Sequence, residues 1–124
     1  MNNMIVKNMT EEEALDKVKA DAINADITFK LMFKNPFIYD GVEYSELHFD
    51  LENLTGRDSL DVERELSMRG IQAPVLAFSG EYIIRIAAKA CLEHIGSDAF
   101  ERMPMKEYSK VRNKIRNFLM SSEL

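Results

Sequence analysis

The 124-residue sequence contains little of what disulfide, metal or phosphate chemistry requires. Its one cysteine, Cys91, cannot form an internal disulfide, and we expect it to be a small buried core residue in a reducing compartment. The two histidines, His48 and His94, have no second ligand at metal-binding spacing. The five glycines form no glycine-rich phosphate loop. These absences disfavour a metal centre and a nucleotide site.

Long apolar runs and nucleophile motifs are also missing. The first residues lack the apolar stretch of a signal peptide. The most apolar stretch, residues 81–95, is shorter than the roughly 20 residues that a membrane span needs. No serine stands in a nucleophile-elbow context, and the carboxylates fall in helix caps and on solvated faces. We therefore expect a cytoplasmic protein without enzymatic activity and without cofactors.

What is present is the composition of one globular domain. Hydrophobic residues make up 46% of the chain and charged residues 30%, and a chain of 124 residues can bury a real core. The net charge of −5 disfavours non-specific DNA binding through the whole surface, although it permits a local basic face. We divide the chain into an N-terminal segment with a peripheral helix, residues 1–26, and a single α+β domain, residues 27–124.

The chain is organised around residues 81–95, which we interpret as a central helix. Its charged residues, Glu81, Arg85, Lys89 and Glu93, recur every four positions and would share one narrow stripe. Apart from His94, the other residues are apolar, so neighbouring elements should cover most of the circumference. We expect the helix to end at Gly96. Four of its residues should be nearly inaccessible to solvent: Ile84, Ala87, Ala88 and Cys91.

Residues 27–51 predict a long antiparallel hairpin. Residues 27–33 alternate as a half-buried strand does, and Asn35-Pro36 interrupts them. Asp40-Gly41 is a residue pair that a two-residue type I′ turn prefers. The return strand, residues 42–51, changes phase near Ser45-Glu46, which predicts one extra residue there, roughly opposite Pro36. The apolar face of this kinked hairpin should lie on the central helix.

Three further segments have helix signals. Residues 11–22 follow a capping box at Thr10 and Glu13, residues 56–69 follow a candidate N-cap at Thr55 and precede Gly70, and residues 105–120 are clearly amphipathic. Residues 97–103 predict only a connection or a single short turn. The fold class that follows is α+β, with a kinked antiparallel β-hairpin packed on a small bundle of three to four helices.

The helix over residues 105–120 has a basic outer face. The basic residues are Lys106, Lys110, Arg112, Lys114 and Arg116. A solvated or intramolecular role is the first interpretation, because the helix dipole already favours cations in the C-terminal half. Contact with a protein partner is the second, and binding to nucleic acid or a membrane surface is the third.

Several segments together resemble one known family. They are Asn35-Pro36-Phe37 through Tyr39-Asp40-Gly41 and Tyr44, then Leu54-Thr55-Gly56-Arg57-Asp58, then Ala87-Ala88-Lys89-Ala90, then Met103-Pro104 with Tyr108, Asn113 and Asn117-Phe118-Leu119. In this order and spacing they resemble the tail assembly chaperone family of long-tailed bacteriophages and their prophages in Gram-positive bacteria. The resemblance covers about residues 27–120.

The resemblance implies a non-enzymatic role in virion morphogenesis. Such chaperones coat the tape measure protein and keep its apolar helices soluble until tail tube subunits polymerise around it. The partners implied are therefore the tape measure protein and the tail tube protein, in the host cytoplasm, and the chaperone is absent from the mature virion. Two other functions stay open: a tail structural or connector protein, and a small nucleic-acid-binding regulator that uses the basic C-terminal helix.

Under the chaperone hypothesis, the working surface is expected near the end of the last helix. The candidate partner-binding residues are Lys106, Lys110, Lys114, Phe118, Leu119 and Met120. The apolar ones would contact a tape measure helix and the lysines would steer an acidic partner, or Phe118 and Leu119 simply close the core. We also expect self-association, because a hairpin with few strands leaves an unpaired edge. A membrane and nucleic acid are not expected partners.

Overall fold

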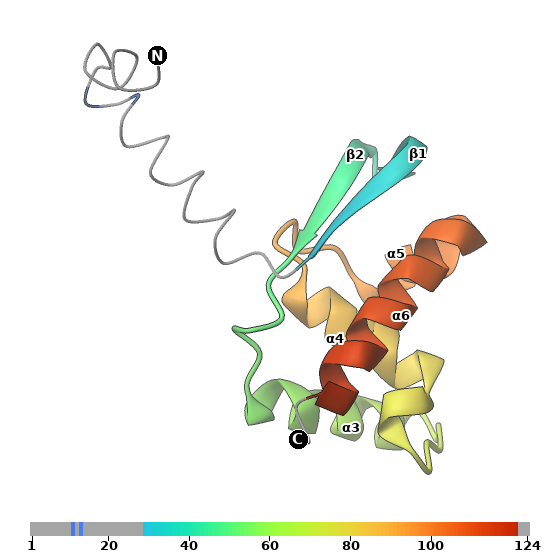
Figure 1. Cartoon of the computed structure of the whole chain (residues 1–124). Coiled ribbons are helices and arrows are strands. Elements are labelled where there is room, and N and C mark those ends of the chain that lie inside the picture. The colour runs from blue at the N-terminus through green and yellow to red at the C-terminus, as the bar shows by residue number, and fades with distance from the viewer. Residues whose placement is uncertain (1–10, 12, 14–28, 122–124) are drawn as a thin grey trace.

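The computed structural model describes residues 11, 13 and 29–121, and it confirms the α+β class (Figure 1). The elements are β1 (Phe29–Tyr39), β2 (Val42–Phe49), α3 (Gly56–Met68), the 3-10 turn η1 (Leu76–Phe78), α4 (Gly80–Ala90), α5 (Ser97–Arg102) and α6 (Met105–Ser121). The hairpin of β1 and β2 projects from one end of the helical part. Most of the predicted helix 11–22 and the boundary at residue 26 lie outside the described residues.

The hairpin turn is the one that its sequence predicts. Asp40 has φ of 49° and Gly41 has φ of 78°, so both central residues lie in the left-handed region that a type I′ turn requires. Tyr39 pairs with Val42 directly beside the turn, which sets the register of the outer half of the hairpin. The aspartate tolerates this conformation and the glycine adopts it without a steric penalty.

The kink lies where the sequence predicts it but on the other strand. Met32 pairs with Glu46 and Phe37 pairs with Tyr44, so residues 33–36 of β1 face Ser45 alone. The surplus residues therefore belong to β1, whereas the prediction placed one extra residue on β2. The reason is Pro36, which has no N–H to donate to a ladder and takes its neighbours out of register. Lys34, inside the irregular stretch, donates its backbone N–H to Glu107 Oε1 of α6 at 3.2 Å.

The inner face of the hairpin forms one side of the core. Its buried residues are Leu31, Phe33 and Phe37 from β1 and Leu47 and Phe49 from β2. The ring of Phe49 lies 5.0 Å from that of Phe29 and 6.1 Å from that of Phe100, measured between centroids. These contacts join the strands to the helical part and confirm that the apolar face of the hairpin packs on the helices.

Helix α3 begins and ends as predicted. Thr55 is the N-cap, and the Asp58 side chain accepts the Thr55 backbone N–H at 2.8 Å. At the other end, Gly70 N–H donates to the Ser67 carbonyl and Ile71 N–H to the Leu66 carbonyl, which is a Schellman motif. Val62 and Leu66 are buried on the side that faces α4.

Helix α4 is central but shorter than predicted, because it ends at Ala90 rather than at Gly96. From Cys91 onward the chain lies along β2: Leu92 N–H donates to the His48 carbonyl at 2.8 Å, and Cys91 forms an isolated bridge with Phe49. Glu93 therefore does not share the helical stripe of Glu81, Arg85 and Lys89. Pairing with an open strand edge satisfies backbone groups that the predicted helical residues 91–95 would have satisfied within the helix.

One predicted core residue of α4 is not fully buried. Ile84, Ala87 and Cys91 are buried, as predicted, but Ala88 is only half-buried. Ala88 lines a shallow pocket between α3 and α4 with Asp61 and Lys89. The small side chain reaches the surface there because the two helices are held together by polar contacts across this position.

The segment predicted as a connection is the short helix α5. Its six residues bury Ala99 and Phe100, and Phe100 is among the largest fully buried side chains. The tertiary contact with Phe49 stabilises a helix that is too short to form alone. Among the described residues, no helix combines the length and the apolar character that a membrane span requires.

Helix α6 packs along both the hairpin and α4. Val111 and Ile115 are fully buried, as the amphipathic pattern predicts. Met105 precedes Val111 and Ile115 at a spacing that puts it on the same apolar side of the helix, but it is 77% exposed. The first turn of α6 extends beyond the covering elements, so the apolar pattern there produces exposed surface rather than core.

Candidate partner-binding surface

The predicted partner-binding lysines all lie on the exposed side of α6. Lys106, Lys110 and Lys114 are spaced four residues apart and are exposed to solvent. None of the three has an ion-pair partner in the part of the chain that the structure describes. Their ammonium groups are therefore accessible to a binding partner. The residues around them determine what kind of partner can bind.

The predicted apolar partner residues divide into two groups. Phe118 and Leu119 are half-buried and pack against the core cluster. Met120 is exposed. Most of the surface of Phe118 and Leu119 is therefore in contact with the core, as the alternative interpretation predicts. Met120 is the most solvent-exposed apolar residue of this set.

A shallow groove connects the lysines of α6 with β1. We call it the lysine groove; its volume is about 420 Å³, and its lining residues are Phe29, Lys30, Lys110, Asn113, Lys114 and Asn117. Lys106 lies one helical turn before it, outside the lining. The structure thus places Lys110 and Lys114 beside Lys30, a residue that the sequence did not associate with them because it lies on a strand far away in the chain.

A larger and more apolar groove lies near the other end of α6. We call it the apolar groove; its volume is about 570 Å³, and its lining residues are Ile71, Gln72, Ser79, Gly80, Glu81, Ile84, Phe100, Glu101, Met103, Met105 and Tyr108. It lies where the loop before η1, the start of α4, α5 and the start of α6 meet. None of the predicted partner-binding residues lines it.

The apolar groove depends on a close approach between α4 and α6 at Gly80. A Cβ atom on Gly80 would lie 3.0 Å from the Tyr108 hydroxyl and 3.2 Å from Arg112 Nη1. The same guanidinium donates to the Tyr108 hydroxyl at 3.3 Å and to the Phe78 carbonyl at 3.0 Å. This cluster holds the tyrosine ring in the groove wall, so the groove is a defined surface and not a gap between loosely packed helices.

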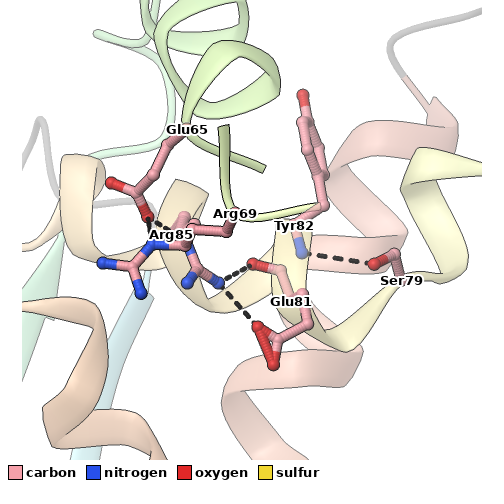
Figure 2. A network of polar contacts seen from close by, with 6 residues as sticks. All are labelled: Glu65, Arg69, Ser79, Glu81, Tyr82 and Arg85. Carbon is pink, nitrogen blue, oxygen red and sulfur yellow. Dashed lines mark hydrogen bonds and ion pairs between the residues drawn. The ribbon is translucent and has the colours of Figure 1, made fainter. Parts of the chain in front are cut away.

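One wall of the apolar groove is stiffened by a polar network between α3 and α4 (Figure 2). Arg85 is 9% exposed and donates through Nε to Glu65 of α3. Its Nη1 donates to the Glu81 carbonyl at 2.9 Å and to Glu81 Oε2 at 2.8 Å. Burial alone would lower the Arg85 pKa, but the hydrogen bonds and charges of both carboxylates raise it, so the guanidinium stays charged.

The start of α4 is fixed by the same network. Ser79, the N-cap, accepts the Tyr82 N–H at 3.3 Å, and the Tyr82 hydroxyl lies 2.7 Å from Ser59 Oγ of α3. Figure 2 shows Ser79, Glu81, Tyr82 and Arg85 at the start of α4, with Glu65 of α3 above Arg85. Ser79 and Glu81 also line the apolar groove, so its rim is held in place from α3.

Sequence reasoning missed the apolar groove, although part of its signal was visible. Met103 and Met105 flank Pro104, and methionine is the residue that adaptable binding surfaces favour. The other half of the signal could not be read, because Ile71, Ile84 and Tyr108 belong to three elements whose contacts are known only from the tertiary fold. Met105 was assigned to the core side of α6 on its spacing alone.

Outside the two grooves, His48 is a titratable side chain held between two carboxylates. Its Nδ1 lies 2.6 Å from Glu93 Oε2, and its Nε2 lies 2.6 Å from Glu46 Oε2. Burial lowers the pKa of His48, but the hydrogen bonds and charges of Glu93 and Glu46 outweigh it, and the net pKa is raised. Two carboxylates on the two ring nitrogens favour the imidazolium form. Within residues 29–121, with Glu11 and Glu13, no group of three His, Cys, Asp or Glu side chains is placed to hold a metal ion.

Comparison with protein-family models, curated proteins and solved structures finds no match to this chain.

Proposed function

We propose that this protein is a tail assembly chaperone of a long-tailed bacteriophage or prophage, which binds the tape measure protein and acts without catalysis. The proposal draws on the family resemblance of residues 27–120 and on one structural observation. That observation is the apolar groove of about 570 Å³, with Met105 77% exposed at its edge, on a domain whose core is otherwise well covered. A chaperone must offer apolar area that a client occupies reversibly.

The chemistry of the groove suits an amphipathic helix. Ile84, Met103 and Met105 provide apolar contact area, and the flexible thioether side chains adapt to different client residues. Glu81 and Glu101 lie at the same groove, so a helix with basic residues beside its apolar stripe would be favoured. A long tape measure protein presents many such segments in succession, and an adaptable groove can bind several of them.

The decisive experiment is co-expression with a candidate tape measure protein from the same genome. Wild-type protein should keep the tape measure protein in the soluble fraction. Met105→Glu should abolish this effect, because it places a charge on the apolar contact area. It should leave the melting temperature unchanged, because the side chain is already exposed.

Met68→Glu is the matched control. Met68 is 82% exposed on α3 and does not line the apolar groove. It should solubilise the tape measure protein as well as wild type does. Equal activity of both variants, or no solubilisation by the wild-type protein, would contradict the proposal.

The protein composition of purified virions distinguishes the chaperone function from the structural or connector function. A chaperone should be absent from purified virions, so its detection there by mass spectrometry in stoichiometric amount would favour the connector function.

The nucleic-acid-binding alternative has one observation in its favour, the three lysines of the lysine groove. It predicts salt-dependent binding to duplex DNA that disappears when those lysines are neutralised.

A further inference from the structure

We propose that the lysine groove is a second binding site, and that it takes a helical protein segment with carboxylates spaced four residues apart. The site is separate from the apolar groove, since the two share no lining residue. The proposal concerns partner chemistry and does not depend on the chaperone function. It rests on the charges, the hydrogen-bond donors and the spacing in the groove.

The charges in the groove are all of one sign. Lys30, Lys110 and Lys114 line it, and no lining residue is acidic. Lys30 Nζ lies 3.8 Å from Glu46 Oε2, a long contact between two partly exposed side chains. Lys110 and Lys114 have no ion-pair partner within the described part of the chain. Two lysines without an ion-pair partner among the described residues, beside a third whose ion pair is long, stand out in a protein of net charge −5.

The neutral polar groups of the groove are also disposed to donate. Asn113 Oδ1 accepts a hydrogen bond from Arg116 Nη2 at 3.2 Å, which leaves the Asn113 amide N–H₂ to donate. The backbone N–H of Lys30 is a further hydrogen-bond donor on the side of β1 that faces away from β2. Its partner His48 uses its own backbone N–H on Glu93 and its carbonyl on Leu92, both away from β1. Lys30 is therefore in a non-hydrogen-bonded pair, and its N–H points to the open edge of β1.

The lysine spacing matches a helix, and the net charge of the protein disfavours a nucleic acid. Lys106, Lys110 and Lys114 recur every four residues, so they advance by roughly 6 Å along α6. Carboxylates at every fourth position of an antiparallel partner helix advance by the same distance. A nucleic acid is disfavoured because a polyanion would also meet the net charge of −5. Phe29 adds an aromatic side chain against which the apolar stems of a partner can lie.

The test uses a labelled synthetic peptide as the probe. The peptide is a 20-residue alanine-based helix with glutamate at every fourth position, and its binding to the full chain is measured by fluorescence anisotropy. We expect saturable binding that weakens as salt is raised. Lys110→Gln with Lys114→Gln should weaken it about tenfold, because two exposed ion pairs are lost.

Two controls keep the test specific. Arg57→Gln with Arg64→Gln removes the same charge from α3 and should leave peptide affinity unchanged. Lys110→Glu with Lys114→Glu should lose the glutamate peptide and gain a peptide with lysine at every fourth position. No binding by wild type, equal loss in the α3 control, or tighter lysine-dependent binding of a 20-base-pair duplex than of the peptide would each overturn the proposal.

Discussion

Cys91 lies where α4 ends, and its thiol faces the interior. Burial raises the pKa of this thiol to about 12, with the nearby charge of Glu93 as a smaller contribution. The reactive thiolate is therefore scarce at neutral pH. We expect no labelling of the native protein by a thiol reagent at pH 8 within the time that the unfolded protein in urea is labelled completely. Rapid native labelling, followed by mass spectrometry, would show that the end of α4 opens readily.

His48 makes folding stability depend on pH. Its folded-state pKa is raised above the ordinary 6.5, so its charged form stabilises the folded state. This contribution is fully present below pH 6.5 and is lost as pH rises through the folded-state pKa. Urea unfolding of the wild-type protein should therefore show a free energy of unfolding that falls as pH rises from 6 towards 9.

The control for this pH dependence is His48→Gln. The variant has no imidazolium to lose, so its free energy of unfolding should be lower at pH 6 and change less between pH 6 and 9. Glu46, Glu93 and Lys30 also face this site, but all three are present in both proteins, so the difference between the two curves reports on His48. Parallel curves would show that its pairs with the carboxylates contribute nothing.

At the scale of elements, the sequence predicted a helix boundary correctly where a local capping signal marks it, and it failed where no such signal is present. Thr55 marked the start of α3 and Gly70 marked its end, because both signals act through neighbouring backbone groups. The end of α4 carried no such signal. Residues 91–95 are as apolar as the helix before them, and the competing partner, the edge of β2 at His48, lies more than forty positions earlier in the chain.

The bulge of β1 depends on a side chain from another element. Glu107 of α6 is 4% exposed and accepts the backbone N–H of Lys34. Glu107→Ala would leave that N–H without its acceptor, and we expect a loss of about 1–3 kcal/mol in the free energy of unfolding. Glu107→Gln should lose much less, because its amide oxygen can accept the same hydrogen bond. Urea denaturation of both variants measures the difference, and equal losses would contradict this account, because glutamine keeps both the volume and the acceptor oxygen of Glu107 and lacks only its charge.

At the scale of the whole molecule, the sequence predicted the architecture but only part of the candidate binding surface. The alternation of residues 29–33 and the amphipathic spacing of Val111 and Ile115 show which side of each element is apolar. This is enough to predict that the apolar side of a hairpin packs on the apolar sides of helices. A groove needs more, because its walls come from elements whose relative position is a tertiary property. Lys110 and Lys114 were found because they share a helix, whereas Lys30 and the whole apolar groove were not.

The two-stranded sheet leaves edges that a second copy can pair with, and self-association stays a prediction. Part of each edge is already satisfied: residues 91–93 cover β2 near His48, and Glu107 covers β1 at Lys34. Nearer the turn, no described group outside the hairpin hydrogen-bonds to the backbone of residues 37–44. This part also carries Ile38, which is 67% exposed on the outer face.

We therefore expect the outer half of the hairpin to be the contact between copies. Sedimentation velocity over a concentration series should show wild-type protein associating, and Ile38→Lys should shift it towards the monomer, because a charge at an exposed strand edge opposes pairing. Leu60→Lys, an exposed apolar position on α3, is the matched change and should associate as wild type does. A wild-type protein that is monomeric at millimolar concentration would exclude the hairpin edge as an interface. Equal effects of the two lysines would instead assign the association to general surface charge.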